Sequence, residues 1–351
     1  MDAVSGTTLT AIVGLIGGLG LGYAARIGRF CTLGAIEDAL YGSSFDRLRM
    51  WGVALGLAIL GCSTLIGSDL LNPFDSFLIR DGWSPLASVI GGLVFGYGMA
   101  LAGNCGYGAL ARLGTGDLRA FVLVGILGVS AYATLYGPLA KLRIWITEIP
   151  VLRQETTTTL SEMASGVTGL PVWSLPLLIG CGLLFWGLRS GDRSKIALWG
   201  GVVALAIVSG WSGTALIAAN SFDLIDVRSH SFSAPVGETV LYLMVSTSKS
   251  VSFAVGSVAG VILGSVIGSL VRREFRWEAC EDPRELKRQV FGAVLMGFGS
   301  VVAMGCSVGQ GLSAFAILSP SAPLVTICVF AGAAIGLRQL IFGLPRLGPA
   351  E

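Results

Sequence analysis

Three cysteines share one sequence context, a glycine-rich interruption of an apolar segment. They are Cys31, Cys105 and Cys306, and each is followed three residues later by glycine. A thiol is a weak hydrogen-bond donor with a polarizable sulfur atom. An interrupted helix exposes backbone N–H groups that favour anions. Thiols at helix breaks therefore predict a path for a soft, sulfur-containing anion. Neutral thiols suit such an anion better than thiolates, because a thiolate would repel it.

The stretches around these cysteines are repeats of one structural unit. Gly17–Gly34 matches Gly91–Gly108 at 7 of 18 positions, and Gly292–Gly309 matches the same stretch at 6 of 18. Both alignments superpose the cysteine and the glycine that follows it. Ser231-Phe232-Ser233 falls near the place that Arg29-Phe30-Cys31 would take in a degenerate fourth unit, which would carry serine instead of cysteine. Repetition of this kind indicates an architecture built from copies of one motif.

Other residues of these units are candidates for contact with the cargo. They comprise glycine backbone and two amide side chains, namely Gly106, Gly108, Gly305, Gly309, Asn104 and Gln310. The amides either contact the cargo or cap the broken helices, and the sequence leaves both roles open. Arg26, Arg29 and Arg112 are expected to attract an anion. Arg26 and Arg29 also suit an alternative role as interfacial anchors.

The elements that position these residues must be membrane-spanning helices. The 351 residues are 53% hydrophobic and only 13% charged, with a mean hydropathy of +0.78. Soluble domains carry about 25% charged residues. The charges lie between apolar segments of roughly 17–25 residues, which is the length that crosses a bilayer. These segments lack the alternating polarity of barrel strands, so the sequence predicts an all-α, polytopic membrane protein.

The remaining composition argues against several other classes of protein. The 7 cysteines form no CxxC or Cys/His cluster, so neither a disulfide framework nor a metal site is predicted. No phosphate-binding loop or cofactor motif is present, and the net charge of +2 gives no reason to expect nucleic acid. Cys62, Cys181 and Cys328 are predicted to be packing residues, and Cys280 to be incidental. His230 is predicted to be a loop residue.

The chain is expected to divide into two halves within a single membrane domain. The first half holds two cysteine units and the second half holds one. The N-terminal half, the polar connector and the C-terminal half are residues 1–140, 141–170 and 171–345. Ala35–Met50 carries several charges and is predicted to be a short surface segment.

Basic loops suggest how the chain is oriented. Short loops rich in Lys and Arg stay on the cytoplasmic side, which here favours 189–195 and 272–288, with Asp46–Arg49 as a weaker third. This assignment gives the units of Cys105 and Cys306 opposite orientations. Inverted repeats with interrupted helices that meet near the midplane are common in transporters. The predicted fold is therefore a set of pseudo-symmetric inverted repeats, with full-length transmembrane helices and broken or re-entrant half-helices.

Three segments resemble the YeeE/YedE family of sulphur-transport, thiosulfate-uptake membrane proteins. They are GRFC at 28–31, AGNCGYG at 102–108 and GCSVGQGLSAFAILS at 305–319. The resemblance implies a protein of the bacterial inner membrane that imports thiosulfate. It also implies a path lined by three cysteines, which map onto Cys31, Cys105 and Cys306. A small cytosolic sulfur-carrier protein of the TusA/SirA type is the partner that the resemblance implies.

Two alternatives to thiosulfate transport stay open from the sequence. A membrane sulfurtransferase would form a persulfide on Cys105 or Cys306, which requires a thiol activated by neighbouring positive charge. The sequence provides no obvious base near any of the three units. A transporter for a selenium compound or another sulfur compound is the second alternative. A sensor or structural subunit is disfavoured, because it would not need three interrupted helices.

Overall fold

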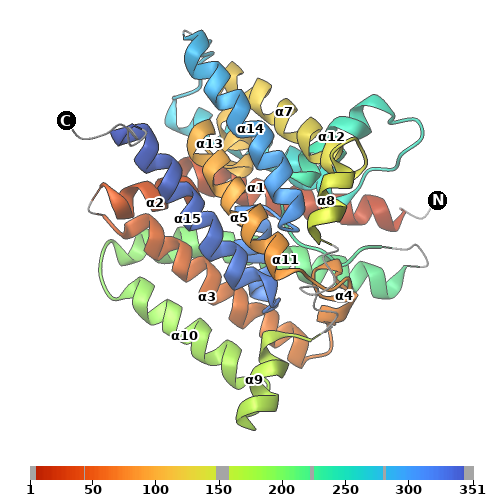
Figure 1. Cartoon of the computed structure of the whole chain (residues 1–351). Coiled ribbons are helices and arrows are strands. Elements are labelled where there is room, and N and C mark those ends of the chain that lie inside the picture. The colour runs from red at the N-terminus through yellow and green to blue at the C-terminus, as the bar shows by residue number, and fades with distance from the viewer. Residues whose placement is uncertain (1–4, 43, 148–157, 222–224, 280–281, 344–351) are drawn as a thin grey trace.

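The structure is a computed structural model that describes residues 5–42, 44–147, 158–221, 225–279 and 282–343. The described residues fold into helices, and an isolated bridge pairs Asp117 with Glu278. Figure 1 shows the helices as one bundle. They are α1 (Gly6–Ile27), α2 (Thr32–Leu40), α3 (Asp46–Gly67), α4 (Phe77–Arg80), α5 (Pro85–Ala102), α6 (Gly106–Leu113), α7 (Leu118–Leu135), α8 (Ala140–Thr147), α9 (Leu160–Thr168), α10 (Ser174–Leu188), α11 (Arg193–Asn220), α12 (Ala234–Met244), α13 (Phe253–Arg272), α14 (Pro283–Val302) and α15 (Ser321–Phe342). A 3₁₀ turn at Pro73–Asp75 and a π-helix at Gly309–Ala314 complete the set.

Seven of the described helical segments are long and apolar enough to cross a membrane. They are Gly6–Leu40, Asp46–Gly67, Pro85–Leu113, Leu118–Leu135, Arg193–Asn220, Phe253–Arg272 and Ser321–Phe342. The prediction of an all-α, polytopic membrane protein is confirmed. Helix α14 has 20 residues but begins with several charged side chains, and it packs between α5 and α7. Helices α9 and α10 lie at the lower edge of the bundle in Figure 1.

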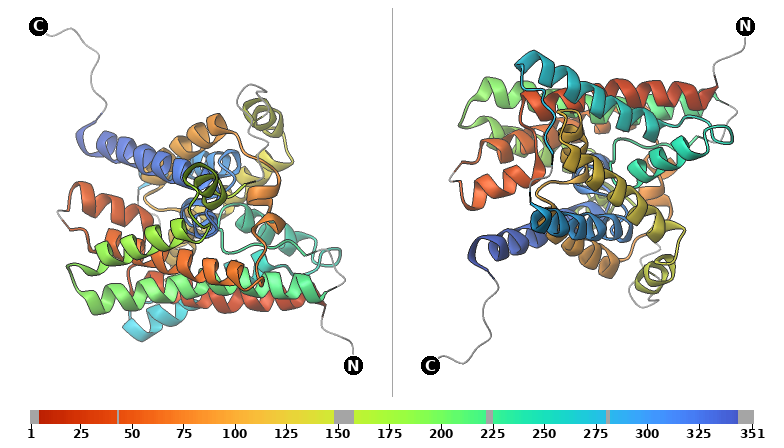
Figure 2. Two further views of the ribbon diagram at one scale, coloured as in Figure 1. Left: turned by 90° about the horizontal axis from the view of Figure 1, so that it is seen from below. Right: turned by 90° about the horizontal axis from the view of Figure 1, so that it is seen from above.

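The long helices of the N-terminal part pack directly on those of the C-terminal part. Helix α1 packs along α13 and also contacts α11, while α3 lies against α11. In Figure 2, α1 (red) and α11 (green) run side by side. Helix α5 packs on both α14 and α15, and α7 packs on α14. The core that surrounds the cysteines is therefore made jointly by both parts of the chain.

Glycines bring these helices into backbone contact. A Cβ atom at Gly22 of α1 would collide with the carbonyl oxygen of Val261 in α13, and one at Gly256 would collide with that of Ala11. Without an aqueous driving force between helices, close van der Waals packing at small residues holds membrane helices together. The high glycine content, 51 residues, thus has a direct structural reason.

Helices α5 and α14, which lead into two of the cysteines, run in opposite directions. Gly91, near the start of α5, lies beside Gly299 near the end of α14. Gly98, near the end of α5, lies beside Gly292 in the first half of α14. Helix α5 therefore approaches Cys105 from the end of the bundle opposite to that from which α14 approaches Cys306.

The prediction of a surface segment at Ala35–Met50 is wrong at its beginning. Helix α2 buries Ala35 and Ile36, and Met50 is buried within α3. The reason is that the chain returns into the protein as a short helix directly after Cys31. Cys280 and residues 148–157 of the polar connector lie outside the described residues. On either side of that gap, the connector forms α8 and α9.

We expect Gly256→Ala to destabilise the bundle, because the added Cβ would meet backbone rather than a movable side chain. Overpacking of this kind costs about 1–3 kcal/mol. The matched control is Gly125→Ala in α7, where a Cβ meets no atom within 4 Å. Thermal unfolding of the two variants in detergent should show a lower midpoint for Gly256→Ala alone. Equal midpoints would contradict the close contact between α1 and α13.

Candidate functional site

Each of the three cysteines sits at the start of a short helix and uses its sulfur atom to cap that helix. In each case the sulfur accepts a hydrogen bond from the backbone N–H of the glycine three residues later. The pairs are Cys31 with Gly34 at 3.5 Å, Cys105 with Gly108 at 3.4 Å and Cys306 with Gly309 at 3.4 Å. The first turn of a helix has N–H groups without intrahelical partners. The repeated Cys-x-x-Gly spacing therefore has a physical origin in helix capping.

The glycines of these motifs also keep space open beside the thiols. A Cβ at Gly309 would lie 2.6 Å from the Ser231 hydroxyl and 3.7 Å from the Cys306 sulfur. A Cβ at Gly108 would lie 3.8 Å from the Cys105 sulfur. Gly106 has a different role, because it packs closely against the backbone carbonyl of Phe232.

One cavity of about 270 Å³, the basic cavity, collects many of the predicted site residues. Its lining includes Cys31, Asn104, Gly108, Arg26, Arg29 and Arg112. Arg47 and Arg272 also line it. Sequence reasoning did not assign these two arginines to the site, although it marked their segments as basic. Five arginines thus surround the Cys31 thiol, with Glu274 as the only acidic side chain in the lining.

The arginines of the basic cavity differ in how they are held. Arg26 forms an ion pair with Glu274 at 2.5 Å, and Arg272 donates to the Ile27 carbonyl at 2.9 Å. Arg29 and Arg112 have no ion-pair partner within the described part of the chain. The backbone of Arg29 has φ 55°, a left-handed conformation that is uncommon outside glycine. The two unpaired cations can therefore attract an anion without first breaking an ion pair.

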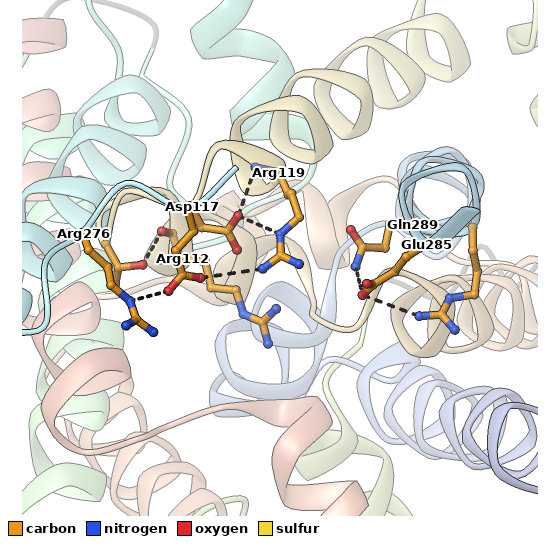
Figure 3. A network of polar contacts seen from close by, with 9 residues as sticks. Arg112, Asp117, Arg119, Arg276, Glu285 and Gln289 are labelled. Atoms are coloured by element: carbon orange, nitrogen blue, oxygen red, sulfur yellow. Dashed lines mark hydrogen bonds and ion pairs between the residues drawn. The ribbon is translucent and has the colours of Figure 1, made fainter. Parts of the chain in front are cut away.

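A charged network lies next to the basic cavity (Figure 3). Asp117 pairs with Arg119 at 3.1 Å, and Glu278 pairs with Arg119 at 3.7 Å and with Arg276 at 2.6 Å. The backbone N–H of Leu118 also donates to the Glu278 carbonyl at 3.0 Å. These contacts join the turn before α7 to the segment after α13. The Arg112 side chain lies beside this network in Figure 3.

A second cavity of about 420 Å³, the serine-rich cavity, lies at the opposite end of α13. Phe253 at the start of α13 lines it, whereas Arg272 at the end of α13 lines the basic cavity. A 20-residue helix spans about 30 Å, the thickness of the hydrocarbon core. Gly305 and Gly309 line the serine-rich cavity, as do the hydroxyl-bearing residues Ser229, Ser231, Ser233, Ser257, Ser300 and Ser313.

His230 is more deeply placed than its sequence context indicated. It lies in a non-helical segment, as predicted, but it is fully buried and lines the serine-rich cavity. Its Nδ1 atom is 2.6 Å from the Ser257 hydroxyl. A lone histidine in a polar stretch gave no signal for this burial.

The Cys306 thiol receives more hydrogen bonds than the other two. Besides Gly309, the backbone N–H of Phe232 donates to its sulfur at 3.3 Å, and the Ser231 hydroxyl is 3.6 Å away. Ser231 thus lies beside Cys306. The sequence singled out Ser231, but it did not predict that Ser231 contacts Cys306.

Buried thiols and aromatic rings lie between the two cavities. Cys105 and Cys306 are 0% and 1% exposed. Cys105 is within electrostatic range of both Cys31 and Cys306. The Tyr107 ring packs between Phe30 and Phe232, with centroid distances of 6.4 and 5.4 Å. The protein is therefore closed at its centre, next to the thiols.

The amide side chains of Gln310 and Asn104, whose roles the sequence left open, have different hydrogen bonds in the structure. Gln310 donates to the carbonyls of Ala303 and Met304 at 3.0 and 3.2 Å, so it caps the end of α14. Asn104 lines the basic cavity, and its buried Oδ1 atom has no hydrogen-bond partner among the described residues. The capping role therefore applies to Gln310, and Asn104 keeps its polar group available to the cavity.

Comparison with known proteins identifies relatives along nearly the whole chain. Residues 27–335 match the family described as sulphur transport. The chain is 26% identical over 326 residues to the thiosulfate transporter TsuA of Spirochaeta thermophila, covering 91% of this chain and 96% of that protein. It is 27% identical over 323 residues to the thiosulfate transporter TsuA of Escherichia coli, covering 87% and 88%.

We expect the three thiols to differ in their reaction with a negatively charged methanethiosulfonate reagent. Cys31 is half-buried in the basic cavity, whereas Cys105 is fully buried. Purified variants that retain one cysteine each, with alanine at the others, should therefore react at Cys31 and stay unmodified at Cys105 and Cys306. The control retains only Cys62, which is buried within α3. Equal labelling at Cys31 and Cys105 would contradict the closed centre.

Proposed function

The chain belongs to the sulphur transport family, and we propose that it carries thiosulfate across the membrane. Two relatives named as thiosulfate transporters align with 87% or more of the chain. The observation that carries the proposal is the set of three sulfur-capped half-helices, at Cys31, Cys105 and Cys306. A selenium compound or another sulfur compound is the alternative cargo, and the names of the relatives favour thiosulfate.

The proposed path uses each thiol as a hydrogen-bond donor. Because the sulfur atom already accepts a backbone N–H, its own S–H proton is free to point to a ligand. The unpaired Arg29 and Arg112 would attract the anion at the basic cavity. Cys31 would contact it there, while Cys105 and Cys306 would contact it at the closed centre. Glycine backbone at Gly108, Gly305 and Gly309 would complete the walls of the path.

We propose that the thiols bind the cargo rather than react with it. In the described part of the chain, the hydrogen bonds to the three sulfur atoms come from backbone N–H groups and one serine hydroxyl. None of these groups can take a proton from a thiol. The sulfurtransferase alternative therefore lacks the base that persulfide chemistry would use.

The inverted-repeat organisation is a further part of the proposal. Residues 1–140 and 171–345 would form pseudo-symmetric halves, each contributing interrupted helices to the path. The opposite directions of α5 and α14 support this arrangement. Broken helices that meet near the midplane allow both halves to contact one cargo ion.

We propose that the basic end of the protein faces the cytoplasm of a bacterial inner membrane. Arg47 and Arg272 line the same cavity, and Gly191 lies against Asp46, so the three predicted cytoplasmic segments share one end. Basic short loops are retained on that side. A small sulfur-carrier protein of the TusA/SirA type would then accept the cargo at this end.

This orientation predicts one-sided labelling of Cys31. In the variant that retains only Cys31, the membrane-impermeant thiol reagent should modify inside-out vesicles and leave right-side-out vesicles unmodified, because the basic cavity opens to the cytoplasmic end. The positive control is the same variant labelled in detergent. Labelling only from the outer side would reverse the proposed orientation.

Loss of a central thiol should abolish uptake. We expect Cys105→Ala and Cys306→Ala to stop growth on thiosulfate of a bacterium that lacks its own sulfate and thiosulfate importers. The matched control is Cys62→Ala, which removes a buried thiol elsewhere and should keep growth. Membrane levels of each variant are measured by immunoblot. Normal growth of both central variants would remove the thiols from the mechanism, and no growth with well-expressed wild type would contradict thiosulfate import.

A further inference from the structure

Three buried polar side chains beside Cys306 have no hydrogen-bond partner among the described residues. The atoms are Thr32 Oγ1, Trp51 Nε1 and Ser307 Oγ. Thr32 begins α2, Trp51 belongs to α3, and Ser307 follows Cys306 directly. They are 0%, 5% and 4% exposed, and all three residues line one small gap together with Cys306. Thr32 and Trp51 thus bring unsatisfied polar atoms to one gap, and the Ser307 hydroxyl there also lies near the Cys105 thiol.

Such a cluster needs a physical explanation. Leaving one buried polar group unpaired costs roughly 1–3 kcal/mol, and native proteins pair nearly all of them. The gap has no room for a water molecule, so solvent does not satisfy these groups. Apolar side chains of the same shape would avoid the cost. The cluster therefore opposes stability, which is typical of groups kept for a ligand.

The hydrogen-bonding capacity of Thr32, Trp51 and Ser307 indicates which kind of ligand they can bind. An indole N–H can only donate a hydrogen bond, and hydroxyls donate readily. The lining of the gap contains no carboxylate that would attract a cation. Gln310 also lines the gap, but its amide nitrogen is engaged by Ala303 and Met304 and its amide oxygen accepts from Ser321. The free groups are thus donors, and their ligand is an acceptor with several oxygen atoms.

We propose that Thr32, Trp51 and Ser307 form a subsite that binds the oxygen atoms of a tetrahedral sulfur oxyanion. The subsite would orient the terminal sulfur of that anion toward the Cys306 thiol. Two backbone N–H groups donate to the Cys306 sulfur, and its S–H proton would turn from the Ser231 hydroxyl, 3.6 Å from the sulfur, toward the ligand. The inference rests on the proposed transport function and adds residues that recognise the oxygen end of the cargo.

The gap is closed in this structure, and the Trp51 ring forms one of its walls. The Trp51 ring lies over Gly311, where a Cβ would be 2.5 Å from the indole, and it meets Phe330 edge-on at 6.2 Å. Glycine at this position lets the indole sit close to the π-helix.

The test replaces each donor by an apolar residue of similar shape, as Trp51→Phe, Thr32→Val and Ser307→Ala. A hydrogen bond to a charged group contributes about 1.5–3 kcal/mol, which corresponds to a loss of about tenfold or more in affinity. We therefore expect the half-saturation concentration for radiolabelled thiosulfate uptake to rise about tenfold or more in each variant. Without anion, each purified variant should unfold at the same temperature as wild type or higher, because an unsatisfied donor has been removed.

The matched control is Trp83→Phe. Trp83 also carries a buried indole N–H without a partner among the described residues, but it lines none of the cavities above. This variant should transport like wild type. In purified protein, sodium thiosulfate should raise the unfolding temperature of wild type and of Trp83→Phe, and raise that of Trp51→Phe much less.

The outcomes separate the subsite from the transport function. Unchanged uptake and unchanged thermal shifts in all three variants would overturn the subsite while leaving transport intact. Lower unfolding temperatures without anion, together with lower uptake, would assign these residues a structural role and also overturn it. If wild type binds thiosulfate but does not carry it, the proposed function fails, and the smaller thermal shift of Trp51→Phe still supports the subsite.

Discussion

The hydrogen bond from a backbone N–H to a cysteine sulfur is the interaction on which the rest of the structure depends. Unwound backbone inside a membrane is tolerated only when its polar groups are satisfied within the protein or by a polar cavity. At Cys31, Cys105 and Cys306 the sulfur accepts one N–H of the following half-helix. One side chain therefore stabilises the break and presents a thiol there. This double role explains why a cysteine stands at each break and why a glycine follows it three residues later.

The breaks in turn require tightly packed surroundings. Helices α1 and α13 approach until carbonyl oxygens occupy the space where a Cβ of Gly22 or Gly256 would lie. Such contacts leave no route for lipid or water between the helices. The buried His230 also pairs with Ser257, which connects the non-helical segment before α12 to α13. The glycine-rich composition and the thiol path are thus two consequences of one architecture.

The sequence predicted the repeated part of the candidate site, which is the Cys-x-x-Gly motif. It did not predict the residues that occur only once. The Cys-x-x-Gly motif stands out because three copies align, and helical spans follow from hydropathy alone. Trp51 and Thr32 gave no signal, since a lone tryptophan or threonine in an apolar segment is typical of packing. Arg47 and Arg272 reach the basic cavity from elements far apart in the chain. The burial of α2 was missed because charges later in Ala35–Met50 concealed its apolar beginning.

The two cavities differ chemically, and this difference bears on direction. Cys31 lines the basic cavity among arginines, whereas Ser231 and Ser233 line a cavity rich in hydroxyl groups. Conduction requires sites that bind well enough for an ion to enter yet weakly enough for it to leave. The serine-rich cavity offers hydroxyl groups and balances its two arginines with Asp81 and Glu238, whereas the basic cavity has five arginines and one acidic side chain in its lining. On the proposed path, an anion that crosses the aromatic layer at Tyr107 would pass between two sites of different chemistry. Neither site would then hold the anion by the same interactions as the other.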